Sequence, residues 1–91
     1  MVSKKITVKN QSGLHARPAG VLAKAAGECK SDVKIIVGEK TIPAKNILKL
    51  MAAAIKCGTE IELQCDGESE QADLESLTAL IEGGFGEEMV E

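Results

Sequence analysis

Polar and apolar residues alternate along the first ten positions of the chain. Val2, Ile6 and Val8 fall on one side of this alternation, and polar residues occupy most of the other side. A period of two is typical of a strand with one buried and one solvated face. Residues 1–10 are therefore predicted to form the first strand.

A helical period replaces this alternation after residues 11–13. Apolar residues recur with the i, i+3, i+4, i+7 spacing of a helix at Ala19, Leu22, Ala23 and Ala26. Such a stripe marks the buried side of an amphipathic helix. Gly27 is predicted to end this helix, because glycine readily takes the conformation that closes helices.

The period of two returns over residues 33–37, where every second residue is valine or isoleucine. Gly38 then stands at the first central position of a two-residue turn, where hairpins often require glycine. A short strand is predicted over residues 40–42, closed by Pro43. Residues 33–42 are therefore predicted to form a hairpin.

A second helix is predicted after Asn46, which is a favoured N-cap residue, and is expected to end near Gly58. Leu48 and Ala52 lie outside the stripe formed by Ile47, Leu50, Met51 and Ala54. The helix is thus apolar nearly all round, which indicates either deep burial or a patch offered to a partner. Because so small a chain has few layers to cover this helix, we favour a partner surface.

The rest of the chain is predicted to form one more strand and one more helix. Ile61, Leu63 and Cys65 alternate with polar residues and exit through a turn at 66–67. Ser69 is predicted to cap a final helix, which residues 83–84 end. The buried stripe of this helix is formed by Leu74, Leu77, Leu80 and Ile81. The tail from Phe85 onward is expected to be loose.

This order of elements, β-α-β-β-α-β-α, predicts an α+β open-faced sandwich. Most strands have one polar side, so helices should cover one face of the sheet while water meets the other. We expect a four-stranded, mainly antiparallel sheet under three helices, with the strand order left open. A length of 91 residues without internal repeats predicts a single domain spanning 1–91.

Charge and composition narrow the classes of partner. The net charge is −3, no long run of lysine or arginine occurs, and Phe85 is the sole aromatic residue. Nucleic-acid binding and attraction to an anionic membrane surface are therefore disfavoured. No apolar stretch suggests a signal peptide or membrane span, so a cytoplasmic location is expected.

The spacing of the three cysteines indicates that they form neither disulfides nor a metal site. Cys29, Cys57 and Cys65 lack CxxC spacing, which disfavours a disulfide framework or a zinc site with the one histidine. Cys65 and Cys29 are interpreted as core residues and Cys57 as exposed, and none is given a function. No metal or cofactor is expected.

The candidate chemistry lies in residues 13–19, Gly-Leu-His-Ala-Arg-Pro-Ala, where a loop meets the first helix. Helix starts carry unpaired amides that Ser, Thr, Asp or Asn usually satisfy, but here the junction residue is His15. Imidazole is a poor cap, so the amides of Ala16 and Arg17 are left for an outside anion, while Pro18 is tolerated in the first turn.

A phosphoryl group is the anion that fits this site best. Its transfer needs a nucleophile, in-line placement and donors for the equatorial oxygens. His15, Arg17 and the helix amides supply all three. The plainer alternative is an exposed histidine beside a solvated arginine, and the short pattern by itself leaves both interpretations open.

Residues 13–19 resemble the active-site segment of the HPr family, the histidine-containing phosphocarriers of the bacterial phosphoenolpyruvate-dependent sugar phosphotransferase system. The resemblance covers nearly the whole chain, including the element order, the Gly38 hairpin and residues 44–48 and 58–59. It implies that enzyme I phosphorylates His15 on Nδ1 and that His15 passes the phosphoryl group to an enzyme IIA domain for sugar uptake. Arg17 would stabilise the phosphoryl charge.

The resemblance also implies a partner surface on both helices, formed by Ala16, Gly20, Lys24, Ile47, Leu48, Lys49 and Met51. The chain would act as a co-substrate of transferases rather than as a stand-alone enzyme, and a monomer is the default expectation. In many Gram-positive members the position of Asn46 is a serine phosphorylated by a regulatory kinase. Asparagine keeps the cap but cannot accept that phosphate. A regulatory or interaction module without a carrier role is the alternative, against which the presence of both His15 and Arg17 weighs.

Overall fold

The chain folds into a four-stranded sheet and three α-helices over the residues that the structure, a computed structural model, describes, namely 1–10 and 13–86. The elements in chain order are β1 (Val2–Thr7), α1 (Ala16–Glu28), β2 (Asp32–Val37), β3 (Lys40–Pro43), α2 (Ile47–Ala52), β4 (Glu60–Asp66), α3 (Glu70–Glu82) and a 3-10 turn, η1 (Gly84–Gly86). Within these described ranges no helix is long and apolar enough to cross a membrane.

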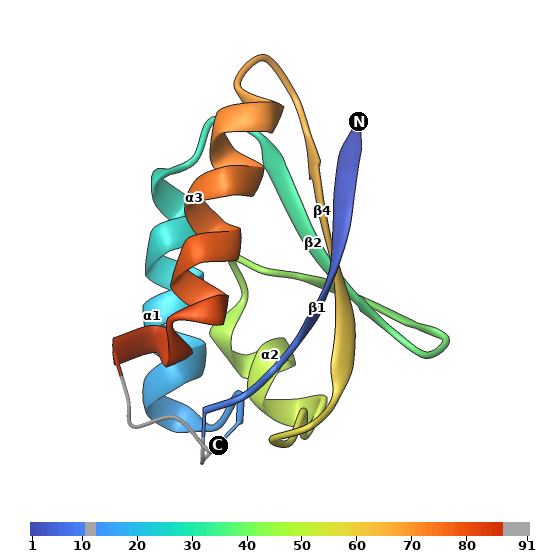
Figure 1. Cartoon of the computed structure of the whole chain (residues 1–91), viewed down its shortest axis with the longest axis vertical. Coiled ribbons are helices and arrows are strands. Elements are labelled where there is room, and N and C mark those ends of the chain that lie inside the picture. Colours follow the sequence, from blue (N-terminus) through green and yellow to red (C-terminus); the bar gives the residue numbers. More distant parts are fainter. Residues whose placement is uncertain (11–12, 87–91) are drawn as a thin grey trace.

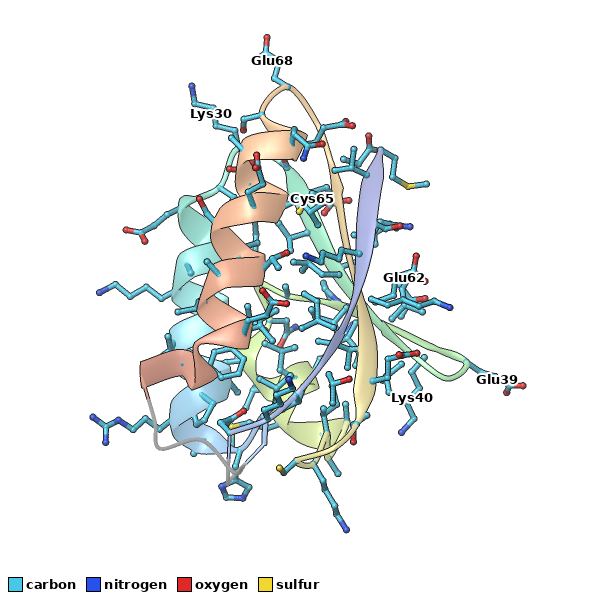
Figure 2. All side chains as sticks on the ribbon, viewed as in Figure 1. Lys30, Glu39, Lys40, Glu62, Cys65 and Glu68 are labelled. Carbon is cyan, nitrogen blue, oxygen red and sulfur yellow. The ribbon has the colours of Figure 1, made fainter. Side chains whose placement is uncertain are left out.

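The sheet has the strand order β1-β4-β2-β3, and all its strand pairs are antiparallel. The helices lie on one side of it, with α1 and α3 side by side and α2 at one end (Figure 1). In Figure 2, Cys65 points from β4 into the space between sheet and helices, whereas Glu62 of the same strand points to the other side. The predicted open-faced sandwich is confirmed, and the structure supplies the strand order.

The predicted hairpin is confirmed in its turn and in its register. Val37 pairs with Lys40, so two residues form the turn, and Gly38 has a φ of 58°. A side chain at this φ is strained, which explains glycine at the first central position. Strand β3 continues through Pro43, one residue beyond the predicted end.

Several predicted boundaries are wrong by a few residues. Strand β1 ends at Thr7, not at residue 10. Helix α1 passes through Gly27, which keeps a negative φ, and ends because Cys29 is extended and donates its amide to Ala26. Helix α2 stops well before the predicted end at Gly58, because Ala54 adopts a left-handed φ of 53°.

The predicted loose tail is also wrong at its first residue. Phe85 is 6% exposed and packs in the core from η1. Leu80, predicted as buried, is only half-buried, whereas Thr78 is 6% exposed. Burial of Phe85 has a simple cause, since the one aromatic side chain removes a large apolar area from water. Residues 87–91 lie outside the described part of the chain.

Apart from Phe85 and Cys65 the core is aliphatic, and it lies between the sheet and the helices. Ile35, Leu63 and Cys65 from the strands and Leu22 from α1 are wholly buried. Burial raises the pKa of the Cys65 thiol to about 11, which keeps it protonated at neutral pH. Cys29 is half-buried and Cys57 is exposed, as predicted for Cys57.

A carboxylate fastens the turn before α3 to the loop after α1. Asp73 accepts hydrogen bonds from the Ser31 hydroxyl at 2.6 Å, the Ser31 amide at 3.1 Å and the Ser69 hydroxyl at 2.7 Å. Ser69 is the N-cap residue, as predicted, but its hydroxyl donates to Asp73 and makes no capping bond to the helix backbone. The Ser31 hydroxyl is the main reason that the pKa of Asp73 is lowered, and the Ser69 hydroxyl adds to it.

The Asp73→Asn variant is expected to remove part of the pH dependence of stability. Because the pKa of Asp73 is lower folded than unfolded, its carboxylate stabilises the fold above the unfolded pKa. That contribution disappears as the pH falls through the folded-state pKa. Denaturant unfolding from about pH 7 to about pH 3 should give a shallower decline for Asp73→Asn. Glu68→Gln, exposed in the same turn, is the control, and an equal decline in all three proteins would contradict the expectation.

Candidate functional site

His15 is the N-cap residue of α1, at the loop–helix junction that the sequence predicts. Its side chain is exposed and makes no capping hydrogen bond, while its carbonyl accepts the Ala19 amide at 2.8 Å. The first amides of a helix have no acceptor within it. Since Ala19 is the first residue to donate back and Pro18 has no N–H, the amides of Ala16 and Arg17 are the ones beside His15.

Gly13 and Leu14, the two residues before His15, are held by close contacts. Gly13 has a φ of 63°, and a Cβ placed there would overlap the Ile55 carbonyl oxygen and lie 2.8 Å from Lys56 Cα. The Leu14 amide donates to the same Ile55 oxygen at 2.8 Å. Wholly buried Asn10 donates its side-chain amide to the Gly13 carbonyl at 2.7 Å. The backbone under His15 is thus fixed while its imidazole reaches solvent.

The segment that supports this loop lies between α2 and β4. It turns at Ala54, buries Ile55, and joins the first strand's end where the Gly58 amide donates to Val8 at 2.7 Å. The Val8 amide in turn donates to Thr59 at 2.9 Å. These bonds bring the end of α2 to the same end of the molecule as the start of α1, as Figure 1 shows.

Helices α1 and α2 pack at this end. A Cβ on Gly20 would lie 3.4 Å from the Ile47 Cδ1 atom, about van der Waals contact, so the side chain of Ile47 lies over this part of α1. Of the two alternatives for α2, deep burial does not hold: only Leu50 of this helix is buried, because its six residues contact their neighbours with one side alone. The exposed apolar side chains on it are Ile47 at 39%, Leu48 at 75% and Met51 at 37%.

The remaining residues of the predicted partner surface lie on both helices. Ala16 and Lys24 on α1 and Lys49 on α2 are exposed, while Gly20 is half-buried beneath Ile47. Asn46 caps α2 as predicted, because its Oδ1 accepts the Lys49 amide at 3.1 Å. The structure thus brings both halves of the predicted surface to one end, beside His15.

The positive charge on the helices extends beyond Lys24 and Lys49, the two lysines of the predicted partner surface. Residues 1–27 and 40–59 contain no aspartate or glutamate, although the chain carries a net charge of −3. The basic residues within them are Lys4, Lys5, Lys9, Arg17, Lys24, Lys40, Lys45, Lys49 and Lys56. The signal was present in the positions of the acidic residues, and it makes α1 and α2 a positive region.

An open-faced sandwich with an exposed histidine at the first turn of α1 has the architecture of a small histidine-containing phosphocarrier. Residues 2–83 match the family PTS-HPr, described as the PTS HPr component phosphorylation site. The chain belongs to this family.

Relatives and solved structures agree with this assignment. The phosphocarrier protein HPr of Mycoplasma capricolum is 44% identical over 82 residues, covering 84% of this chain and 92% of that protein. The HPr-like protein Crh of Bacillus subtilis is 40% identical and covers 90% of this chain and 96% of its own length. The crystal structure of HPr-C-His from Thermoanaerobacter tengcongensis has a TM-score of 0.93 at 34% identity, covering 98% of this chain and all of that one.

Proposed function

We propose that this chain is a cytoplasmic phosphocarrier that accepts a phosphoryl group on His15 from phosphorylated enzyme I and passes it to enzyme IIA domains. The observation that carries the proposal is the position of His15, exposed at a helix start with no capping bond of its own. The Nδ1 lone pair attacks phosphorus and forms the P–N bond while the bond to the donor breaks. Transfer to the acceptor repeats this displacement in the opposite direction.

The groups around His15 suit a transferred dianion. The Ala16 and Arg17 amides lie at the positive end of α1, and the Arg17 guanidinium is permanently charged and exposed. Such donors stabilise charge on the phosphoryl oxygens without needing a metal of their own. Asn46 offers no hydroxyl, so we propose that regulation by phosphorylation is absent at this position.

Docking in this proposal uses the apolar patch of α2 and the positive residues around it. Ile47, Leu48 and Met51 present apolar area, and Lys24 and Lys49 attract a partner with an acidic surface. A monomer presents this face to both partners in turn. A non-carrier interaction module is the second candidate, because the family relatives include the HPr-like protein Crh.

Intact mass spectrometry tests the carrier proposal. The chain is incubated with phosphoenolpyruvate and a purified enzyme I, and then with an enzyme IIA domain. We expect one acid-labile phosphoryl group that appears in the first step and moves to the acceptor in the second. Uptake without onward transfer would favour the interaction module, and absence of uptake with an active enzyme I would contradict the proposal.

Arg17→Ala is expected to slow phosphoryl acceptance by about 10-fold to 100-fold, because it removes the charge assigned to the phosphoryl oxygens. The free energy of unfolding should change by less than about 0.5 kcal/mol, since the side chain is exposed. Rapid-quench transfer from phosphorylated enzyme I measures the rate. Lys30→Ala, at an exposed residue outside the predicted partner surface, is the control for general loss of positive charge. Equal rates for the two variants would place Arg17 among ordinary solvated residues.

Leu48→Ala is expected to weaken binding of an enzyme IIA domain by about 10-fold, because it removes the most exposed apolar side chain on α2. Stability should stay within about 0.5 kcal/mol. Leu50→Ala, its buried neighbour, is the matched contrast: it should cost about 2 to 5 kcal/mol of stability. Calorimetric titration and denaturant unfolding separate the two effects, and unchanged affinity of Leu48→Ala would remove this residue from the docking surface.

A further inference from the structure

We propose that the docking surface continues past the exposed side of α2 into a groove between α2 and β3, and that an apolar side chain from an acidic segment of the partner occupies it. We call this the β3–α2 groove. The inference rests on the proposed function and specifies the kind of partner that the function requires. It adds Lys40, Thr41, Ala52 and Ala53, residues that neither the motif nor the family resemblance assigned.

The β3–α2 groove has a volume of about 340 Å³. Its lining consists of Lys40, Thr41, Ile42, Lys49, Ala52 and Ala53. Ile42 is only 5% exposed and forms an apolar floor. The consecutive alanines keep the helix wall short, so the groove has room for a side chain of valine or leucine size. Burying such a side chain stabilises a complex through the apolar area removed from water.

The groove is continuous with the apolar patch. Leu48 and Ala52 are one helical turn apart at i and i+4, and therefore neighbours on the surface of α2. Leu48 is 75% exposed in the patch, and Ala52 lines the groove. A partner that covers Leu48 therefore lies beside the groove.

The charge of the groove identifies its occupant as acidic. Two lysines, Lys40 and Lys49, line it, and none of its lining residues is a carboxylate. Glu39 is the acidic residue next to Lys40 in sequence, and Figure 2 shows it pointing outward from the hairpin tip, while Lys40 points toward the end of the molecule where α2 lies. Carboxylates flanking the inserted side chain would pair with the two ammonium groups and set the orientation of the partner.

A second copy of this chain is the less favourable occupant. In a symmetric contact each copy presents the same patch to the other. Two such faces would bring Lys40 and Lys49 of one copy toward the same positive residues of its partner, and like charges at close range oppose association. We therefore commit to an acidic segment on a different protein.

Two variants test the groove, each with a matched control. Lys40→Glu reverses its charge, and Lys30→Glu makes the same change at the far end of the molecule (Figure 2). Ala52→Phe fills the groove, and Ala72→Phe adds the same bulk on the exposed side of α3. The unphosphorylated proteins are titrated separately with an enzyme IIA domain and with enzyme I, and thermal unfolding checks each fold. We expect both groove variants to weaken at least one complex about 10-fold and the controls to leave Kd within about 2-fold.

Several outcomes would overturn the inference. If the groove variants bind both partners as tightly as their controls do, the groove is not part of the docking surface. If Ala52→Phe unfolds, the affinity of Lys40→Glu alone tests the groove. Concentration-dependent self-association that the groove variants abolish would assign the groove to a second copy. Binding is measured here without phosphoryl transfer. If the chain takes up phosphoryl but the groove variants bind both partners normally, only this inference is refuted. If the chain takes up no phosphoryl, the carrier function is refuted.

Discussion

The His15→Ala variant is expected to take up no phosphoryl group from phosphorylated enzyme I and to keep its fold. His15 is the one histidine of the chain, so no second imidazole can replace it. Its side chain is exposed and makes no capping bond, so alanine should change the free energy of unfolding by less than about 1 kcal/mol. Intact mass after enzyme I treatment and denaturant unfolding provide the two measurements.

The His15→Asn variant separates the effect of this residue on stability from its effect on phosphoryl acceptance. Asparagine is a favoured N-cap residue, and it should stabilise the protein by about 0.5 to 1 kcal/mol while removing phosphoryl acceptance as completely as alanine does. Opposite signs for stability and activity at one residue would show that an uncapped helix start is retained for chemistry. An acid-labile phosphoryl group on either variant would refute His15 as the acceptor.

Gly13→Ala is expected to lower the free energy of unfolding by about 3 kcal/mol and to impair phosphoryl acceptance. Two effects add here: a φ of 63° is strained for alanine, and the new Cβ would overlap the Ile55 carbonyl. To relieve this overlap, residues 13–14 must move away from residues 55–56, and this movement displaces the imidazole of His15. Denaturant unfolding and single-turnover transfer measure both consequences.

Gly38→Ala is the matched control for this substitution. Its φ of 58° is nearly the same, but a Cβ there meets no atom within 4 Å. Alanine at Gly38 should therefore cost only the conformational part, about 1 kcal/mol, and leave transfer unchanged. Equal destabilisation at the two glycines would show that backbone conformation alone, and not the contact with Ile55, fixes Gly13.

The sequence predicts the parts of this fold that local patterns determine. The strands follow from alternation at positions such as Ile61 and Leu63, the hairpin from Gly38, and the start of α2 from the cap formed by Asn46. Each depends on residues within a few positions of one another. Burial of Phe85 does not, because it depends on the space left between α1 and α3 after the helices pack.

The same distinction applies to the site. His15 stands where the loop–helix pattern places it, and the exposed apolar side of α2 agrees with the apolar excess in its sequence. The support under the loop was not predictable, because Ile55 and Lys56 reach Gly13 only through the tertiary fold. The early end of α2 at Ala52 has the same origin, since the strained φ of Ala54 directs Ile55 into the core.

The basic side chains on residues 1–27 and 40–59 act on a partner over a limited distance. Residues 1–27 and 40–59 carry basic and no acidic side chains, whereas Glu28, Asp32, Asp66, Glu68 and Glu70 lie around the far end of α1 and the turn before α3. There the Met1 amino group pairs with Asp66 and Glu70, and Lys34 pairs with Asp32. Salt at cellular concentration screens charges beyond about 8 Å, and the molecule extends over 34 Å. An approaching partner therefore senses the nearer end alone, so an acidic partner is attracted when it meets the helix pair, and collisions are sorted by orientation before any contact forms.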